Sequence, residues 1–382
     1  MPVSSQKGSF LEHITIQDSF PIGPEQLEAA AMHTLPEEVF GHIRSGAGGE
    51  ETLRKNRTAF EKYSIIPRCL NNVSKVDTSI RILGKEYAFP FMVAPIGHLK
   101  MVHEEPDFAI ANVAASMNIP YIQSTVTARS IEEVSEAVPE GPKWFQLYWS
   151  SNAAISYSMA KRAEKAGYEA IVVTVDTVML GWREDDMRYQ YSPLKKGYGK
   201  ANYVQDPVFQ KGLKDGQDEI DSIIENLHHP HLHWDNIAEL RQHTNLPIFL
   251  KGILHPEDAI QAAEAGIDGI VVSNHGGRQM DGIIPSLEAL PAIRKAVGPD
   301  FPLLFDSGIR RGADVIKALA LGADAILLGR PYAYALALQG EAGVQKLFAN
   351  LAQEVSVSMA LSGAKTVEEV KQLTLKASDY SL

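Results

Sequence analysis

The chain has 382 residues, of which 45% are hydrophobic and 22% charged, the composition of an ordinary globular protein. Its formal net charge of -11 argues against a nucleic-acid partner, which would require basic patches. Cys69 is the only cysteine, so an intrachain disulfide is excluded. We find no basic start followed by an apolar run, and no apolar stretch of about 18 residues. We therefore expect a cytoplasmic protein without a signal peptide or a membrane partner.

The first 89 residues are predicted to form a helical annex. Residues 1–23 have no periodic pattern and are expected to form an irregular arm. Apolar residues four positions apart predict one helix over residues 24–43. This stripe consists of Leu27, Ala31, Leu35, Val39 and Ile43. Glycines at 46–49 end it, a charged helix is predicted over 50–62, and short strand-like pieces follow at 64–66 and 79–83.

From residue 90 onward, short apolar runs alternate with amphipathic helical segments, as expected when strands are covered on both faces. The predicted strands are residues 91–94, 121–124, 144–148, 170–175, 248–251, 269–273, 303–306 and 325–328. Eight strands alternating with helices favour an α/β fold of the (β/α)8 TIM-barrel type over a doubly wound open sheet. We predict a single domain over residues 1–382, with the annex at 1–89 and the barrel at 90–382.

One connection is much longer than the others. No strand-like pattern occurs between Asp176 and Asn245, and we place an insertion at about residues 184–240, after the fourth strand. Its polar sequence with interleaved aromatics suggests a lid over the site, and a disordered surface insertion is the alternative. The histidine-rich run His228–His233 lacks an accompanying carboxylate or cysteine pattern, so we predict no metal site.

Polar side chains end nearly every predicted strand, and barrel enzymes build their sites at these ends. The most informative stretch is Ser273-Asn-His-Gly-Gly-Arg-Gln-Met-Asp281. His275 could accept a proton near neutral pH, and Arg278 could clamp a carboxylate through two hydrogen bonds. A tight turn with incidental polar residues is the alternative interpretation. The other strand ends supply Ile96, Gly97, Ser124, Gln146, Tyr148, Thr174 and Asp176.

Two glycine-containing stretches follow the seventh and eighth strands, Asp306-Ser-Gly-Ile-Arg-Arg-Gly312 and Gly329-Arg-Pro331. Loops in these places often bind phosphate, and Arg310 and Arg330 would add positive charge; surface turns are the alternative. Lys251 ends an apolar strand, where an unpaired ammonium is costly. It would either form a Schiff base or lie against a group that becomes anionic.

At these residues the chain resembles the FMN-dependent α-hydroxy acid oxidising family. The resemblance spans roughly residues 24–370, and its most specific part is Ser273-Asn-His-Gly-Gly-Arg-Gln279. Supporting matches are Ser45-Gly-Ala-Gly48, Ala94-Pro95, Phe145-Gln-Leu-Tyr148, Thr174-Val-Asp-Thr177, Leu250-Lys-Gly252, Asp306-Ser-Gly-Ile-Arg-Arg-Gly312 and Leu328-Gly-Arg-Pro331. Within the family, Ala94-Pro-Ile-Gly97, Leu180-Gly-Trp-Arg183 and Asn202-Tyr-Val-Gln-Asp-Pro-Val-Phe209 look most like lactate 2-monooxygenase, with L-lactate oxidase as the neighbouring type.

The resemblance implies FMN as the cofactor, a small (S)-2-hydroxy acid and O2 as substrates, and a homotetramer or homo-octamer. His275 would be the base, with Asp176 as its carboxylate partner. Arg278 and Arg183 would clamp the substrate carboxylate, with Tyr148 nearby. Lys251 would lie near flavin N1 and O2, which disfavours a Schiff base. The remaining FMN contacts would be Ile96, Gly97, Ser124, Gln146, Thr174 and Ser273 at the flavin, and Asp306, Gly308, Arg310, Gly329 and Arg330 at the ribityl phosphate.

His42 departs from the family pattern, because members usually carry at this position a Tyr that binds the substrate carboxylate. Histidine can donate a hydrogen bond, but it is shorter and titrates near neutral pH. The resemblance otherwise implies oxidation of L-lactate, either to pyruvate with hydrogen peroxide or, if the oxo acid is retained, to acetate, CO2 and water, and it favours the second outcome. A 2-hydroxy acid dehydrogenase, an FMN-dependent isomerase and a non-catalytic flavin binder remain as alternatives.

Overall fold

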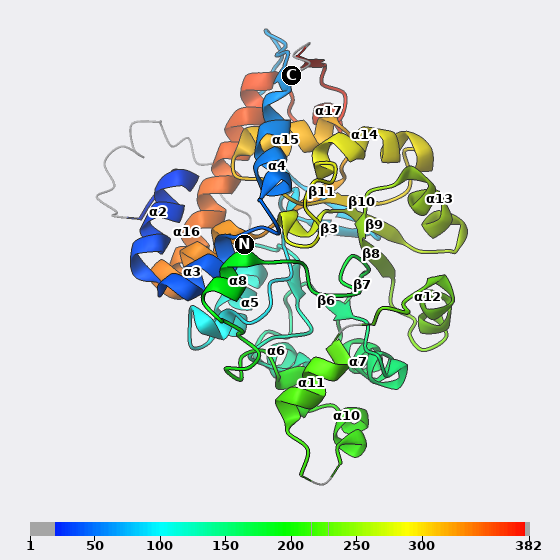
Figure 1. Cartoon of the computed structure of the whole chain (residues 1–382). Coiled ribbons are helices and arrows are strands. Elements are labelled where there is room, and N and C mark those ends of the chain that lie inside the picture. The colour runs from blue at the N-terminus through cyan, green and yellow to red at the C-terminus, as the bar shows by residue number, and fades with distance from the viewer. Residues whose placement is uncertain (1–19, 215, 228, 379–382) are drawn as a thin grey trace.

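The computed structural model describes residues 20–214, 216–227 and 229–378, with a closed barrel of parallel strands at the centre (Figure 1). The strands follow one another around the barrel in chain order, and the last pairs with the first. Their bounds are β4 (Phe91–Val93), β5 (Tyr121–Gln123), β6 (Lys143–Tyr148), β7 (Ile171–Thr174), β8 (Ile248–Ile253), β9 (Gly269–Val272), β10 (Leu303–Phe305) and β11 (Ala325–Leu328). The predicted (β/α)8 barrel is confirmed, and the open sheet is excluded.

The register of the strands determines which side chains meet at the barrel mouth. Tyr148 pairs with Thr174, and Thr174 pairs with Lys251, so these three residues lie at the same level on neighbouring strands. The strands are almost completely buried, because helices cover them on the outside and large side chains such as Trp144 and Phe249 fill the inside. The buried strands hold the polar side chains at their C-terminal ends in fixed positions.

Between each barrel strand and the next, and after the last, the chain forms a helix on the outside of the barrel (Figure 1). These helices are α5 (Pro106–Ser116), α6 (Ile131–Ala137), α7 (Ala153–Lys165), α12 (Trp234–Arg241), α13 (Pro256–Glu264), α14 (Ser286–Val297), α15 (Gly312–Ala320) and α16 (Arg330–Ser362). The longest, α16, is kinked at Gln339 and Gly340, where the backbone leaves helical geometry. Short helical turns complete the barrel: η1 (Leu99–Met101), η2 (His275–Gly277) and α17 (Val367–Val370).

The annex contains α2 (Pro24–Thr34), α3 (Glu37–Arg44) and α4 (Glu51–Glu61), with β1 (Tyr63–Ile65) paired to β12 (Leu375–Ala377) and β2 (Ile80–Ile82) to β3 (Lys85–Tyr87). The prediction of one helix over 24–43 is wrong, because Leu35 and Pro36 are extended between α2 and α3. Proline removes a helical donor and disfavours helical geometry in the preceding residue. Residues 1–19 of the predicted arm lie outside the described residues.

The segment between β7 and α12 contains no strand among its described residues, as predicted, but it is not irregular. It forms α8 (Glu184–Arg188), α9 (Ala201–Val204), α10 (Pro207–Gly212) and α11 (Glu219–Leu227), with α10 and α11 at the bottom of Figure 1. The predicted end of the insertion at residue 240 is too late, because α12 is the outer helix that the barrel rhythm requires before β8.

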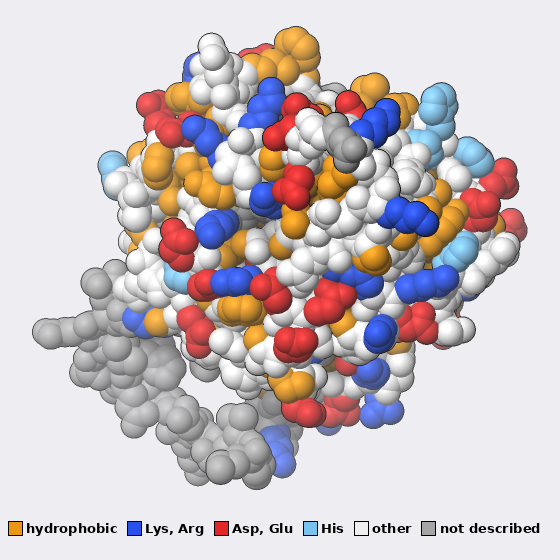
Figure 2. All heavy atoms as spheres, turned by 90° about the horizontal axis from the view of Figure 1, so that it is seen from below, with side chains coloured by type: hydrophobic (Ala, Val, Ile, Leu, Met, Phe, Trp, Pro, Cys, Tyr) orange, Lys and Arg blue, Asp and Glu red, His pale blue; other side chains and the backbone are white. Residues whose placement is uncertain are grey.

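The surface in Figure 2 intersperses Lys and Arg side chains with Asp and Glu, so this face has no continuous basic patch. Along the described parts of the chain, no helix combines the length and apolar character needed to cross a membrane. α16 is the longest helix, and buried apolar residues along it pack into the core.

Candidate active site

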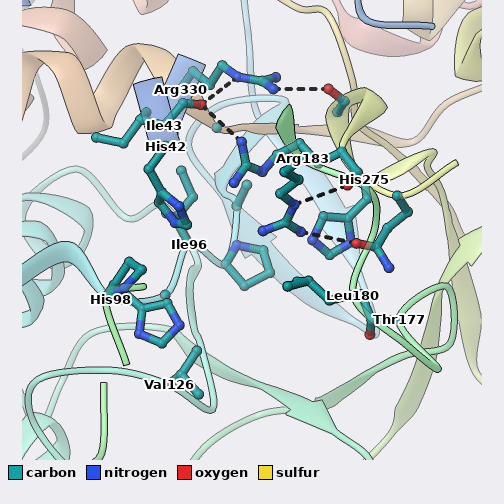
Figure 3. A pocket seen from close by; sticks show the side chains of 18 of the residues that line it. His42, Ile43, Ile96, His98, Val126, Thr177, Leu180, Arg183, His275 and Arg330 are labelled. Carbon is teal, nitrogen blue, oxygen red and sulfur yellow. Dashed lines mark hydrogen bonds between the residues drawn. The ribbon is translucent and has the colours of Figure 1, made fainter. Parts of the chain in front are cut away.

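A cavity of about 410 Å³ lies at the C-terminal ends of the barrel strands (Figure 3). This volume falls within the range of roughly 300–1,000 Å³ that ligand pockets occupy. The predicted site residues that line it are His42, Ile96, Gly97, Tyr148, Arg183, Lys251, His275, Arg278, Asp306, Gly308, Arg310, Gly329 and Arg330. The other predicted residues, Ser124, Gln146, Thr174, Asp176 and Ser273, form a second layer behind the cavity wall, and hydrogen bonds join them to one another or to residues of the wall.

His275 lies in a sharp turn that begins where β9 ends. His275, Gly276 and Gly277 all have positive φ angles, of 57°, 65° and 72°. A Cβ atom at Gly277 would lie 2.8 Å from the backbone nitrogen of Leu53, so only glycine fits the turn at this position. The turn thus directs the imidazole into the cavity while α4 packs against the backbone.

The imidazole of His275 is held by a carboxylate, since Nδ1 lies 2.9 Å from Oδ1 of Asp176. Burial lowers the pKa of His275, Asp176 opposes this shift, and Lys251 lowers the pKa further. Burial alone would raise the pKa of Asp176, but His275 and Lys251 keep it below its ordinary value. The pair is therefore a neutral imidazole beside an ionised carboxylate, in which Nδ1 donates and Nε2 is free to act as a base.

Arg183 and Arg278 bring two positive charges to the same cavity. Arg183 donates through Nε to the carbonyl of Arg278 at 3.2 Å and through Nη2 to Gln279 Oε1 at 3.0 Å. Arg278 donates through Nη1 to the carbonyl of Ser45 at 2.7 Å. Burial lowers the pKa of both guanidinium groups, and their mutual repulsion lowers that of Arg278 further. Neutral acceptors orient the two cations without cancelling their charge, which suits an anionic ligand.

Lys251 is buried, and Asp306 is its counter-ion. Its Nζ lies 3.2 Å from Asp306 Oδ2 and donates to Ser273 Oγ at 3.0 Å. Burial alone would lower the pKa of Lys251, but Asp306 and Asp176 raise it above its ordinary value. The amine is therefore protonated, which disfavours the Schiff-base alternative.

Asp306 was predicted to help hold the ribityl phosphate. One of its oxygens pairs with Lys251, and the other accepts a hydrogen bond from Ser307 at 2.7 Å. These contacts place its carboxylate beside Lys251, and a contact with the phosphate stays a prediction.

The opposite end has the features of a phosphate site. Gly308 has a φ angle of 95°, and a Cβ there would lie 2.3 Å from the carbonyl oxygen of Asn56, whereas a Cβ at Gly329 would meet only open space. Among the described residues, Arg330 donates to the carbonyls of Ile43, Ser45 and Gly276. Burial lowers the pKa of Arg310, and it lowers that of Arg330 to about 10. Buried guanidinium groups satisfied by carbonyls alone still need a counter-charge, and a phosphate supplies one.

Behind the cavity, Gln146 connects neighbouring strands. Its Oε1 accepts from Ser124 Oγ at 3.0 Å, and its Nε2 donates to Thr174 Oγ1 at 2.9 Å. The structure joins these side chains to one another, as a layer that supports the cavity wall. Their predicted contacts with the cofactor stay a prediction.

Sequence reasoning missed the residues that the insertion contributes. Asp186, Tyr191 and Leu194 line the cavity, and Asp186 Oδ1 lies 2.8 Å from His42 Nδ1. The sequence contains only a weak indication that these residues belong to the site. Asp186 follows Arg183 by three residues, and Tyr191 lies in the polar stretch with interleaved aromatics. His98 also lines the cavity; it makes a hydrogen bond of 2.9 Å to the carbonyl of Tyr198, and burial lowers its pKa to about 4.

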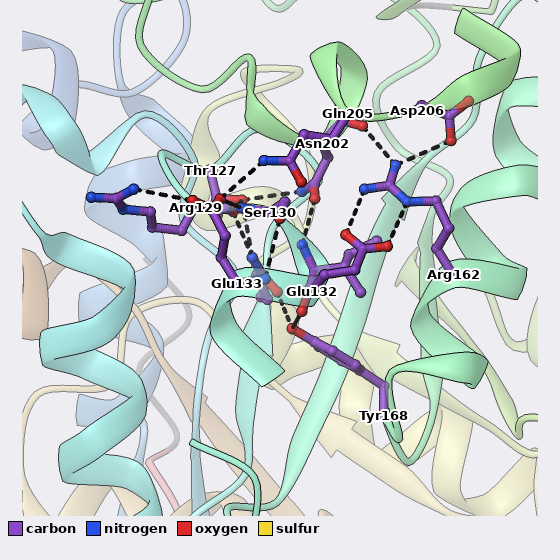
Figure 4. Close-up of polar contacts among 12 residues, drawn as sticks. Thr127, Arg129, Ser130, Glu132, Glu133, Arg162, Tyr168, Asn202, Gln205 and Asp206 are labelled. Atoms are coloured by element: carbon purple, nitrogen blue, oxygen red, sulfur yellow. Dashed lines mark hydrogen bonds and ion pairs between the residues drawn. The ribbon is translucent and has the colours of Figure 1, made fainter. Parts of the chain in front are cut away.

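The insertion reaches the cavity because it is bonded to the barrel behind it (Figure 4). Asn202 is fully buried and donates to the carbonyl of Thr125 at 3.0 Å and to Thr127 Oγ1 at 3.1 Å. Arg162 on α7 donates to the carbonyl of Asn202 at 2.7 Å and pairs with Asp206 at 3.1 Å. These bonds hold the segment that follows residues 191–195, which themselves line the cavity, and do not support the disordered alternative for this part of the insertion.

No group of three or more His, Cys, Asp and Glu side chains within the described ranges is arranged to hold a metal ion. In the histidine-rich run, His229, His231 and His233 are described, whereas His228 is not. Of these, only His229 and His231 form a ring contact, with centroids 6.0 Å apart.

The fold and this cavity define a TIM-barrel protein whose strand ends bring together a His–Asp pair, a buried lysine and several buried arginines. The FMN-dependent dehydrogenase family matches residues 31–377, and the chain belongs to this family. It is therefore an FMN-dependent oxidoreductase. The buried arginines at the phosphate end and the cationic Lys251 fit FMN, which has a phosphate at one end and a ring that becomes anionic at the other.

The chain is similar to known enzymes over nearly its whole length. It is 55% identical to an L-lactate oxidase of Lysinibacillus sphaericus, over 97% of this chain and 96% of that one. It is 41% identical to a 4-hydroxymandelate oxidase of Amycolatopsis orientalis, over 92% and 97%. A crystal structure of mandelate oxidase with (S)-4-hydroxymandelic acid is 40% identical and superposes with a TM-score of 0.86, over 94% and 99% of the two chains.

Proposed function

We propose that this protein oxidises a small (S)-2-hydroxy acid, with L-lactate as the substrate, to the 2-oxo acid and transfers the electrons to O2. The products are pyruvate and hydrogen peroxide. The observation that carries this proposal is the neutral His275, held by Asp176, in the same cavity as Arg183 and Arg278. The 55% identity to an L-lactate oxidase supports lactate as the acid and oxygen as the acceptor.

Different residues of the cavity bind the substrate and accept its proton. Arg183 and Arg278 bind the substrate carboxylate and place the hydroxyl toward His275. Nε2 of His275 takes the proton that the substrate loses, and Asp176 stabilises the imidazolium that forms. FMN, when bound, supplies the acceptor for the two electrons.

The cofactor contacts follow from the chemistry of the two ends. Gly308, Arg310, Gly329 and Arg330 would hold the phosphate of FMN. Lys251 would stabilise negative charge on the flavin, because its ammonium is buried and protonated. Tyr148 lines the same cavity, and burial raises the pKa of its hydroxyl, so the hydroxyl remains a donor at neutral pH.

The test is a product assay on the purified holoenzyme with (S)-lactate in air, in which peroxide, pyruvate and acetate are quantified together. Peroxide and pyruvate in equal amounts support the proposal. Acetate with little peroxide would mean that the oxo acid is retained and decarboxylated, the lactate 2-monooxygenase outcome. Flavin that bleaches without oxygen but reoxidises slowly in air would indicate a dehydrogenase. Flavin that lactate does not bleach would refute the substrate assignment and leave an isomerase or a non-catalytic flavin binder.

The carboxylate clamp can be tested with a matched pair of arginine variants. Arg183→Met should raise KM for lactate by about 10- to 150-fold, because a hydrogen bond to a charged group contributes about 1.5–3 kcal/mol. Arg311→Met removes an arginine that does not line the cavity and pairs with Glu25. It should leave KM unchanged, and equal effects of the two variants would count against the clamp.

We also propose a homotetramer or homo-octamer in the cytoplasm, and a role for residues 191–195 as a cover over the site. The family resemblance supports the assembly, and the position of Tyr191 and Leu194 on the cavity supports the cover. Light scattering on the purified holoenzyme measures the subunit number directly, and a monomer would contradict this part of the proposal.

A further inference from the structure

His42 is a titratable side chain in the cavity that the mechanism above does not use. It lies near the end of α3, is 9% exposed, and lines the same cavity as Arg183 and Arg278 (Figure 3). Its ring contacts Tyr191 of the insertion, with ring centroids 5.8 Å apart. It therefore lies where the annex, the barrel and the insertion meet, beside the groups that bind the substrate carboxylate.

The hydrogen bond to Asp186 determines which nitrogen of His42 faces a ligand. Nδ1 lies 2.8 Å from Asp186 Oδ1. Asp186 is ionised, because His42 and the nearby Arg278 hold its pKa below the ordinary value against the effect of burial. An ionised carboxylate only accepts hydrogen bonds, so the ring proton of neutral His42 is on Nδ1. Nε2 then has a lone pair, and it can bind an anion only after taking up a second proton.

The groups around His42 shift its pKa in opposite directions. Burial lowers its pKa, Asp186 raises it, and Arg278 and Arg183 lower it. Asp185, the next acidic residue, is engaged by Arg44 and Arg188. His98 is neutral, and burial raises the pKa of Tyr191 to about 12, so neither changes its charge near pH 7. Without a ligand, the two arginines thus favour the neutral ring.

A bound carboxylate reverses this balance. It neutralises the field of Arg183 and Arg278 and adds a negative charge beside Nε2, so the protonated ring becomes favourable. We propose that a 2-hydroxy acid binds to this site together with one proton, which His42 accepts at Nε2 to donate a hydrogen bond to the substrate carboxylate. This inference rests on the proposed function, since it concerns the same substrate carboxylate. It makes His42 a positioning residue that couples substrate affinity to pH.

Proton uptake on binding determines how the affinity for a carboxylate changes with pH. A group whose pKa is higher in the complex than in the free enzyme strengthens binding as the pH falls. Between the two pKa values of His42, the dissociation constant for a carboxylate should rise with pH, by up to about tenfold per pH unit. His98 is neutral throughout this window, so the remaining histidine on the cavity that could produce such a slope is His275.

The experiment uses oxalate, a small carboxylate that has no hydroxyl or Cα hydrogen to lose, titrated into the intact holoenzyme. Calorimetry in two buffers of different ionisation enthalpy gives the number of protons taken up, and the flavin absorbance gives the dissociation constant from pH 5.5 to 8.5, values chosen to span roughly the unperturbed pKa of histidine. The expected result is uptake approaching one proton and a dissociation constant that rises with pH. His42→Tyr should still bind oxalate, because the hydroxyl donates without titrating, but the uptake and the slope should vanish.

Three outcomes would overturn the inference: no proton uptake by the parent enzyme, a His42→Tyr variant that keeps the full slope, or a slope that disappears only when His275 is replaced. If His42→Tyr does not fold, His42→Gln is the second variant, and the same loss of slope is expected. The proposed function can fail separately. Flavin that lactate does not bleach, together with proton-linked binding of oxalate, would refute lactate oxidation and leave the role of His42 intact.

Discussion

Asp176 uses only one of its carboxylate oxygens: Oδ1 lies 2.9 Å from Nδ1 of His275, while Oδ2 is buried with no hydrogen-bond partner in the described chain. Burying an oxygen without a hydrogen bond costs free energy of folding, so packing of neighbouring residues must help to hold this carboxylate in place. Gly252 is part of that environment, because a Cβ at this position would lie 2.6 Å from the Cβ of Asp176. Burial opposes the ionised form of Asp176, and the nearby His275 and Lys251 keep its pKa below the ordinary value.

Asp176→Asn should preserve the shape of the pair and reverse its hydrogen bond. The new amide can donate to Nδ1, which would leave the ring proton on Nε2, where it blocks proton acceptance. We expect kcat to fall by about 10²- to 10⁴-fold with little change in KM. Anaerobic stopped-flow bleaching of the flavin by lactate measures this step. Asp300→Asn, at an exposed position, is the charge-matched control, and equal loss in both variants would contradict the assignment.

The pH dependence of catalysis should have its acid limb below pH 6.5. Burial lowers the pKa of His275 from its ordinary value of 6.5, and the positive charge of Lys251 adds to the shift. The base form of the free enzyme exists above this pKa, so the contribution of His275 to kcat/KM should be lost as the pH drops through the lowered value. Measuring the kcat/KM profile in the His42→Tyr variant removes the dependence of substrate binding on His42. A midpoint above 6.5 would contradict the prediction.

Lys251→Met should destabilise the protein by leaving Asp306 buried and unpaired. Breaking a buried ion pair costs about 3–5 kcal/mol in the free energy of unfolding. The double variant Lys251→Met/Asp306→Asn removes the isolated charge and should recover part of this loss. Urea unfolding with excess FMN measures the stability of both variants.

Flavin reduction provides the second readout for this pair. Both variants should reduce flavin slowly, because neither has the ammonium that stabilises negative charge on the ring. Recovery of the reduction rate together with stability in the double variant would show that Lys251 acts only through folding.

Arg310→Gln should weaken binding of FMN but not of riboflavin. A hydrogen bond between charged groups contributes about 1.5–3 kcal/mol, so the dissociation constant for FMN should rise by about 10- to 150-fold. Riboflavin lacks the phosphate and serves as the internal control in the same fluorescence titration of apoprotein. An equal loss of affinity for both flavins would place Arg310 elsewhere than at the phosphate.

Asn202→Ala should release the insertion from the barrel. The substitution leaves buried carbonyls and the N–H of Ile131 without their partner, at a cost of about 1–3 kcal/mol in the free energy of unfolding. Hydrogen exchange should become faster in residues 191–204, and KM for lactate should rise as the cover loosens. Gln205→Ala, at an exposed position in the same segment, is the control and should change neither quantity.

The break between α2 and α3 shows how two local signals competed in the sequence. A stripe from Leu27 to Ile43 predicted one helix, and Leu27, Ala31, Val39 and Ile43 are indeed buried or nearly so. Pro36 was the opposing signal, and it prevailed because its backbone restriction is covalent whereas a periodic stripe is satisfied equally well by two helices.

The sequence by itself determined the barrel and most of its site. Apolar runs at regular intervals specify buried parallel strands, and in this architecture the residues after each strand must meet at one mouth, whichever side chains they carry. That rule found His275, Arg278, Lys251 and the glycines of the last two loops before any contact was known. It needed only the order of residues along the chain.

Only the tertiary structure decided which of these groups pair. His42 and Asp186 are 144 residues apart, and Asp176 and His275 are 99 apart. Lys251 pairs with Asp306, so this carboxylate lies beside the lysine. Such pairings depend on barrel closure, strand register and the path of the insertion. These bring distant side chains to within hydrogen-bond distance, and no local propensity encodes that distance.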